Sequence, residues 1–145
     1  MSLDGQYDPD NIFAKIVRGE APAAKVFEDH DTLAFMDVFP QGRGHMMVIH
    51  KRARARNLFD IDPQDLHAVM LTVQRVALAA RATLKPDGVY IAQFNGQVAG
   101  QTVFHLHFHV IPRWEGVPLG RHAGGGMADM AELKELAEQI ALEIA

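Results

Sequence analysis

Cysteine is absent from the 145 residues of the chain. Its absence excludes disulfide bridges, thiolate zinc sites and cysteine nucleophiles, so any catalytic chemistry has to come from other side chains. Long hydrophobic runs are also missing, because no apolar stretch approaches the roughly 20 residues that span a bilayer. Residues 1–10 lack the basic and apolar regions of a secretory signal. We therefore expect a cytoplasmic protein with no membrane partner.

A surplus of positive charge is likewise missing. Lys and Arg together number 14 against 18 Asp and Glu, which gives a formal net charge of -4. Nucleic-acid binding usually requires a strongly basic surface, so this balance argues against such a partner and favours a small ligand. One basic run, 51–56, is a candidate contact for a polyanion. We favour the simpler interpretation, which is a solvated loop.

Hydrophobic periodicity predicts the fold class. Three segments place apolar residues at helical spacing: 11–18, 62–84 and 129–145. In the second, Asp62 is the expected N-cap with Pro63 at the first helical position, and the apolar stripe that should face the sheet includes Met70. Five short apolar runs lie between turn signals and are typical of strands: 25–28, 32–36, 45–49, 89–94 and 103–111. With hairpin-type connections, this order predicts an α+β fold, an antiparallel sheet covered by helices, in a single domain of residues 1–145. The first three residues follow no pattern and are left out of this prediction.

Histidine is over-represented, with eight residues, and three of them alternate in the run His105-Leu106-His107-Phe108-His109. On a strand, this spacing puts the three imidazoles on one face and the apolar side chains on the other. A merely solvated face is a poor explanation, because exposed strand positions normally carry Thr, Lys or Glu. The run therefore predicts a functional surface.

Two kinds of chemistry compete for this surface. Histidine is the commonest metal ligand, but the outer pair lies about 13 Å apart along a strand, too far to share one ion without ligands such as His45 or His50. A nucleophile uses the spacing better, because neutral imidazole attacks phosphorus near pH 7. His107 is the central residue, and its neighbours could hold its tautomer and bind phosphoryl oxygens. We predict a nucleophile and no metal, and the turn Gly100-Gln101-Thr102 offers donors beside it.

The same residues resemble the signature of the histidine triad (HIT) superfamily, which the segment 100–113 carries. Earlier segments resemble the family in the same order: 12–16, 27–29, 34–37 and 44–49. The resemblance covers about residues 9–114 and leaves the helix at about 129–145 outside. It implies an antiparallel sheet of about five strands and a homodimer that binds purine nucleotides without a cofactor.

The resemblance also implies roles for individual residues. His107 would be the nucleophile that takes a nucleotidyl group from the α-phosphorus, and His105 would orient it through its backbone carbonyl. Other residues would contact the rest of the substrate. His109 and His45 would contact the phosphate, Thr102 would lie near the leaving group, and Asp37 would bind the ribose. An apolar slot for the base would be formed by Phe13, Ile16, Phe35 and Val38, for which core packing is the alternative. Gln101 belongs to the turn before the triad, and Asn95 stands where relatives have a polar contact residue.

Departures from the family pattern narrow the prediction. His109 stands where the uridylyltransferase-like branch has glutamine, so hydrolysis is favoured over transfer. The N-terminal half most resembles the Hint branch, which cleaves nucleoside phosphoramidates. The alternatives are a diadenosine polyphosphate hydrolase and a nucleotide-binding regulatory protein with incidental turnover. Asn11 and Ala14 stand where some bacterial members have zinc-binding cysteines, which argues against structural zinc. The segment 114–126 follows no motif.

Overall fold

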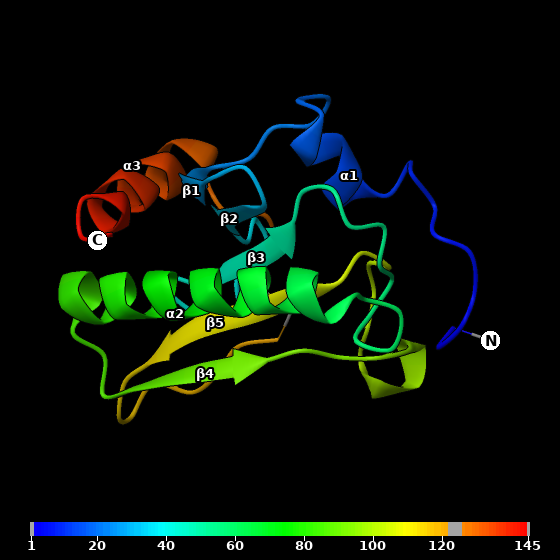
Figure 1. The fold of residues 1–145 in the computed structure, drawn as a ribbon. Helices are drawn as coiled ribbons and strands as arrows, with labels where there is room; N and C mark the ends of the chain where they lie inside the picture. Colours follow the sequence, from blue (N-terminus) through cyan, green and yellow to red (C-terminus); the bar gives the residue numbers. More distant parts are fainter. Residues whose placement is uncertain (1, 122–125, 145) are drawn as a thin grey trace.

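The computed structural model describes residues 2–121 and 126–144 and confirms the predicted α+β architecture. Its elements, in chain order, are α1 (Ile12–Val17), β1 (Lys25–Glu28), β2 (Thr32–Met36), β3 (Met46–His50), α2 (Pro63–Leu84), β4 (Gly88–Ala92), the 3₁₀ turn η1 (Gln97–Ala99), β5 (His107–Arg113) and α3 (Met130–Ala141). Figure 1 shows α2 lying across β3 and β5, with α3 beside β1. Within the described ranges, no helix is long and apolar enough to cross a membrane.

The strands form one five-stranded antiparallel sheet in the order β1-β2-β3-β5-β4. β2 and β3 are buried along their whole length, because each has a neighbour on both sides and both faces are covered. β5 pairs with β3 in a register that sets His109 opposite Met47 and His107 opposite Ile49. The last two histidines of the triad therefore lie near the middle of the sheet.

Alternation along the strands divides the core into two clusters. Apolar side chains of α2 and α3 pack on one face of the sheet, over residues such as Met46 and Val48. The other face packs against α1, where Phe13 and Ile16 meet Leu33, Phe35, Met47 and Ile49. Residues paired across an antiparallel ladder share a face, so His107 and His109 point to the α1 side. His107 and His109 thus lie on the opposite side of the sheet from the core cluster under α2 and α3.

The long helix begins where its cap predicts. The Asp62 side chain accepts a hydrogen bond from the Gln64 N–H at 2.9 Å, and Pro63 occupies the first helical position. A buried hydrogen bond of 2.6 Å between the hydroxyls of Thr32 and Thr72 ties the helix to β2. One expectation about its apolar stripe is wrong. Met70 is 40% exposed on the outer face, because a helix this long keeps only one narrow stripe in contact with the sheet.

The last strand is shorter at its start than predicted and longer at its end. β5 begins at His107 rather than at residue 103, and it continues to Arg113, opposite Gly88 of β4. The ladder with β3 ends at the pair Ile49–His107, because the Leu106 N–H donates to the Ala55 carbonyl instead. His105 therefore lies outside the strand. The prediction that all three imidazoles share one strand face is wrong.

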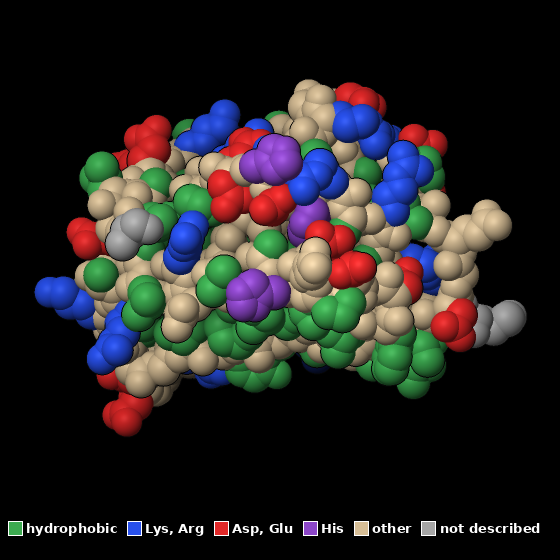
Figure 2. Space-filling model, viewed as in Figure 1, with side chains coloured by type: hydrophobic (Ala, Val, Ile, Leu, Met, Phe, Trp, Pro, Cys, Tyr) green, Lys and Arg blue, Asp and Glu red, His purple; other side chains and the backbone are tan. Residues whose placement is uncertain are grey.

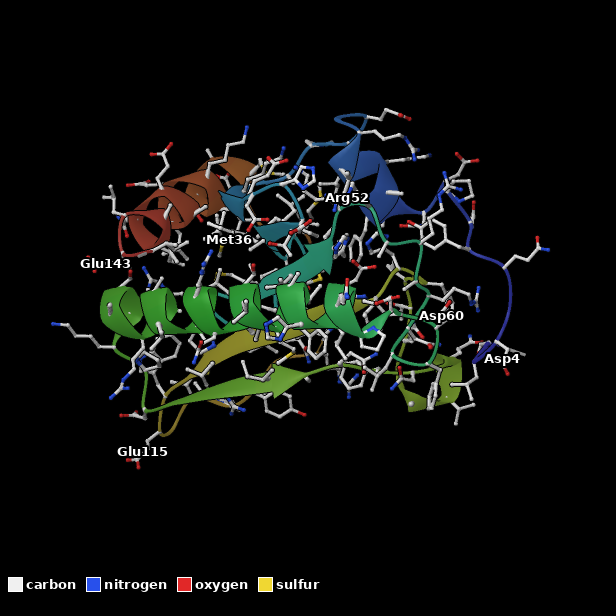
Figure 3. The ribbon with its side chains drawn as sticks, in the orientation of Figure 1. Asp4, Met36, Arg52, Asp60, Glu115 and Glu143 are labelled. Atoms are coloured by element: carbon white, nitrogen blue, oxygen red, sulfur yellow. The ribbon has the colours of Figure 1, made fainter. Side chains whose placement is uncertain are left out.

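Three of the four cations in the basic run 51–56 form ion pairs or hydrogen bonds within the molecule. The Lys51 ammonium lies 2.7 Å from the Glu28 carboxylate, and the Arg52 guanidinium lies 2.6 Å from Asp31. Arg52, labelled in Figure 3, follows directly on β3. Arg56 donates to backbone carbonyls of the N-terminal segment. These contacts tie the run to neighbouring segments of the chain.

Candidate active site

A cavity of about 600 Å³ opens on the α1 side of the sheet. His107 and His109 line it together with Asp37 and Thr102. All four residues predicted for the base pocket also line it: Phe13, Ile16, Phe35 and Val38. Three of the four are almost fully buried from solvent, so they serve both the core and the cavity wall. A pocket of this size with apolar walls and a few converging polar groups is typical of a small-molecule site.

His107 has its tautomer fixed by the backbone. Its Nδ1 lies 2.7 Å from the carbonyl oxygen of His105. A carbonyl can only accept, so Nδ1 carries the proton, and the lone pair of the neutral ring is on Nε2. The Phe13 ring packs edge-on against the imidazole, with centroids 4.8 Å apart. In its neutral form the ring therefore has a defined orientation, with its lone pair on Nε2.

His109 has the opposite tautomer, which is fixed through His45. The backbone N–H of Gln41 donates to His45 Nδ1 at 3.0 Å, so the proton of neutral His45 is on Nε2. That N–H donates to His109 Nδ1 at 2.8 Å. The remaining proton of His109 is therefore on Nε2. The sheet thus carries a nitrogen lone pair on His107 beside an N–H donor on His109, with ring centroids 5.0 Å apart.

Asp37 lies at the end of β2 and is buried next to this chain. One carboxylate oxygen accepts from the Phe39 N–H at 2.8 Å, and the other lies 3.4 Å from His45 Nε2. Asp37, His45 and His109 together form a group that could hold a metal ion. The 2.8 Å separation of the two histidine nitrogens is shorter than the roughly 3.4 Å between two ligands of a tetrahedral ion with bonds of about 2.1 Å. The arrangement therefore fits a hydrogen-bonded pair better than two ligands of one ion.

His105 lies behind the site rather than in it. Its ring is 2% exposed and is not part of the cavity wall. His105 Nε2 donates to the His50 carbonyl at 3.0 Å, and Nδ1 lies 2.6 Å from the Tyr7 hydroxyl. Burial lowers the pKa of His105 from 6.5 to about 4, so the ring is neutral near pH 7. Its contact with the site is the carbonyl that holds His107.

Gln101 and Asn95 do not belong to the cavity wall. The buried amide of Gln101 accepts from the Gly96 N–H and donates to two backbone carbonyls, so it holds the loop before the triad in shape. Asn95 accepts from the Leu58 N–H and pairs with Gln93, on the outer side of the same loop. Both residues therefore act on loop structure, and only Thr102 of this segment's predicted residues reaches the cavity.

Sequence reasoning missed several wall residues. Met47 lines the cavity because it is paired with His109, and alternation would identify it once the strand register is known. Met127 and Met130 come from the end of the chain, and no sequence signal links them to the triad. They are brought in because the Ala128 N–H donates to the Val38 carbonyl at 2.8 Å. Met127 directly follows the unassigned segment 114–126, of which residues 122–125 lie outside the described residues.

Comparison with known proteins finds a matching family model and relatives that are described as HIT-like. Residues 18–116 match the family model described as HIT domain. An uncharacterized HIT-like protein of Mycobacterium tuberculosis is 45% identical over 101 residues, which cover 70% of this chain and 69% of the relative.

Two solved structures resemble the whole fold. A Hit-like protein involved in cell-cycle regulation from Bartonella henselae, crystallised with an unknown ligand, superposes with a TM-score of 0.91 at 42% identity and covers 97% of this chain and 100% of its own. A hypothetical histidine triad nucleotide-binding protein from Sulfolobus tokodaii superposes with a TM-score of 0.77 at 30% identity and covers 89% of this chain and 87% of its own.

Proposed function

Because the chain belongs to the HIT family, we propose that it is a nucleotide hydrolase that cleaves purine nucleoside phosphoramidates at the α-phosphorus. The reaction passes through a covalent nucleotidyl intermediate on His107. The observation that carries this proposal is the 2.7 Å hydrogen bond from His107 Nδ1 to the His105 carbonyl, which leaves the nucleophilic lone pair on Nε2. The name of the Sulfolobus relative, a nucleotide-binding protein, agrees with the proposed ligand class.

The cavity offers a complementary surface for each part of such a substrate. The base lies between Phe13, Ile16 and Phe35, whose apolar surfaces accept a purine without reading its edge. The Asp37 carboxylate accepts hydrogen bonds from ribose hydroxyls. The phosphate oxygens accept from the Nε2–H of His109, which His45 holds in the donating tautomer.

The reaction has two balanced steps. In the first, the lone pair of His107 Nε2 forms a bond to phosphorus, and the bond from phosphorus to the amine breaks. The leaving amine takes one proton from solvent through the Thr102 hydroxyl. In the second, water attacks the same phosphorus, the bond to Nε2 breaks, and one proton returns to solvent. The products are the amine, the nucleoside monophosphate and free His107. The carbonyl of His105 stabilises the positive ring of the intermediate, since Nδ1 keeps its proton throughout.

We also propose that the protein acts as a homodimer. β4 is an edge strand of the sheet, and an edge with open backbone groups can pair with a second copy. In the view of Figure 2, hydrophobic side chains gather over the lower part of the molecule, along α2 and β4. The exposed apolar residues of these two elements are Met70, Leu71, Leu78, Tyr90 and Ile91. A two-fold partner would cover the edge and this surface together.

The test of the proposed activity compares wild type, His107→Ala and His67→Ala. His67 is an exposed histidine of α2 and serves as the control. With a fluorogenic adenosine phosphoramidate, we expect His107→Ala to lose at least about a thousandfold in kcat and His67→Ala to match wild type. Faster turnover of diadenosine polyphosphates by wild type would favour that substrate class instead. Loss of activity with a chelator, together with stoichiometric zinc, would contradict the covalent mechanism.

A further inference from the structure

An N-terminal strap, defined here as residues 2–7, closes over the back of the triad. Figure 1 shows the N-terminal segment running along the right edge of the molecule, from α1 to the loop that carries η1. Asp4 and Asp60, labelled in Figure 3, lie on this same side of the view. Residues 2 and 3, which follow no sequence pattern, both make hydrogen bonds to the rest of the fold.

Several hydrogen bonds hold the strap in place. Arg56 donates to the carbonyl of Ser2 at 2.8 Å and to that of Gln6 at 3.2 Å. Asn57 donates to the Leu3 carbonyl at 2.9 Å, and the backbone N–H of Gln97 donates to the Ser2 hydroxyl at 2.8 Å. The strap is thus attached to the loop after β3 and to the loop before β5.

Tyr7 ends the strap with its hydroxyl on the ring of His105. The His50 carbonyl can only accept, so His105 Nε2 carries the proton of the neutral ring. His105 Nδ1 is then an acceptor, and the Tyr7 hydroxyl donates to it at 2.6 Å. The two rings pack at a tilt, with centroids 5.6 Å apart. Both nitrogens of the buried ring are therefore satisfied, one by the strap and one by β3.

We propose that Tyr7 is a positioning residue for the nucleophile, acting through His105 on His107. This inference rests on the proposed function. The path has three links: the Tyr7 hydroxyl fixes the His105 ring, the ring fixes its own backbone, and the backbone carbonyl holds the proton on His107 Nδ1. Tyr7 is not part of the cavity wall, so its effect is on orientation rather than on substrate binding.

Removal of the hydroxyl leaves a buried acceptor without a donor. His105 is 2% exposed, so the lone pair on Nδ1 cannot be solvated in place of the tyrosine. The His105 ring can then turn or change its tautomer. The backbone carbonyl of His105 moves with the ring. His107 consequently spends part of its time with the proton on Nε2, the form that cannot attack phosphorus.

The experiment compares Tyr7→Phe with the control Ser2→Ala, which removes the other hydroxyl of the strap, one that accepts from the Gln97 N–H and does not contact His105. Tyr7→Phe keeps the ring and removes only the hydroxyl. We expect its kcat for the adenosine phosphoramidate to fall about tenfold, with KM unchanged within about twofold. Ser2→Ala should match wild type in both constants. A Tyr7→Phe enzyme with unchanged kcat, or with only a raised KM, would overturn the proposal.

A second measurement in the free protein separates this inference from the proposed activity. Histidine ¹⁵N spectra report which ring nitrogen carries the proton. We expect wild type and Ser2→Ala to show His107 protonated on Nδ1, and Tyr7→Phe to show a mixture of tautomers. If the wild-type protein hydrolysed no nucleotide, the proposed function would fail while this coupling could still be observed. Unchanged His107 signals in folded Tyr7→Phe would overturn the coupling itself.

Discussion

Replacement of His105 by glutamine should remove much of the acid sensitivity of folding. His105 is buried and its pKa is lowered to about 4, whereas an exposed histidine in the unfolded chain titrates near 6.5. Above pH 6.5 neither state binds a proton at this residue. Between pH 6.5 and 4 the unfolded chain binds one and the native protein does not, so stability falls as the pH falls.

The size of the effect follows from the same pKa values. Each pKa unit corresponds to about 1.4 kcal/mol, so this residue alone removes about 3 kcal/mol over the whole window and about 2 kcal/mol by pH 5. Because His105 is 2% exposed, solvent screening should reduce this figure little. The lowered pKa of His50, also caused mainly by burial, acts in the same direction and persists in the variant.

The assay is urea unfolding at pH 7.5, 6 and 5, at one fixed protein concentration, since association of copies would shift apparent stability. Glutamine can still donate to the His50 carbonyl, so His105→Gln is the least disruptive change. The wild type should lose about 2 kcal/mol more than His105→Gln between pH 7.5 and 5. His67→Gln serves as the control and should follow wild type. Equal losses in wild type and His105→Gln would refute the assignment of a buried neutral imidazole.

Three further predictions concern packing and assembly. Gly44→Ala should destabilise the fold by about 2–3 kcal/mol in urea unfolding, because φ is +82° and a Cβ would lie 3.1 Å from the Pro112 ring and 2.5 Å from Leu84 Cδ1, which has to move. Gly19→Ala, at φ +79° with nothing within 4 Å, should cost only about 1 kcal/mol. Thr72→Val should cost about 1–2 kcal/mol through loss of a buried hydroxyl pair, and an unchanged midpoint would contradict that. Leu78→Glu should raise the monomer fraction in analytical ultracentrifugation, and a monomeric wild type would contradict the proposed dimer.

Local sequence signals predicted the parts of the fold that depend on local chemistry. The cap at Asp62 and the helical spacing after it fixed the start of α2 to the residue, because capping depends only on neighbouring atoms. The strand boundaries depend on partners far away in sequence. The alternating pattern continues back to residue 103, but β5 begins at His107, because the ladder with β3 ends at the Ile49–His107 pair and the Leu106 N–H bonds to Ala55. A single strand cannot reveal where its partner ends.

The candidate site also combines residues that local sequence predicts with residues that only distant contacts bring in. His107 and His109 could be identified from their spacing, and they do share the cavity. His105 could not be placed, because its orientation depends on Tyr7 and on the His50 carbonyl, both far from it in the chain. Met127 enters the cavity wall through the end of the chain, where no motif marks it. Contacts across long sequence separations therefore account for most of what the sequence did not predict.

The central claim is that His107 becomes covalently attached to a nucleotidyl group. Its most direct test is to mix the wild-type protein with an adenosine phosphoramidate, quench the reaction within the first turnovers, and locate the modified residue by mass spectrometry. The account predicts an adenylyl group on His107 in wild type and none in His107→Ala. An active enzyme that yields no adduct, or one that carries the adduct on another residue, would contradict it.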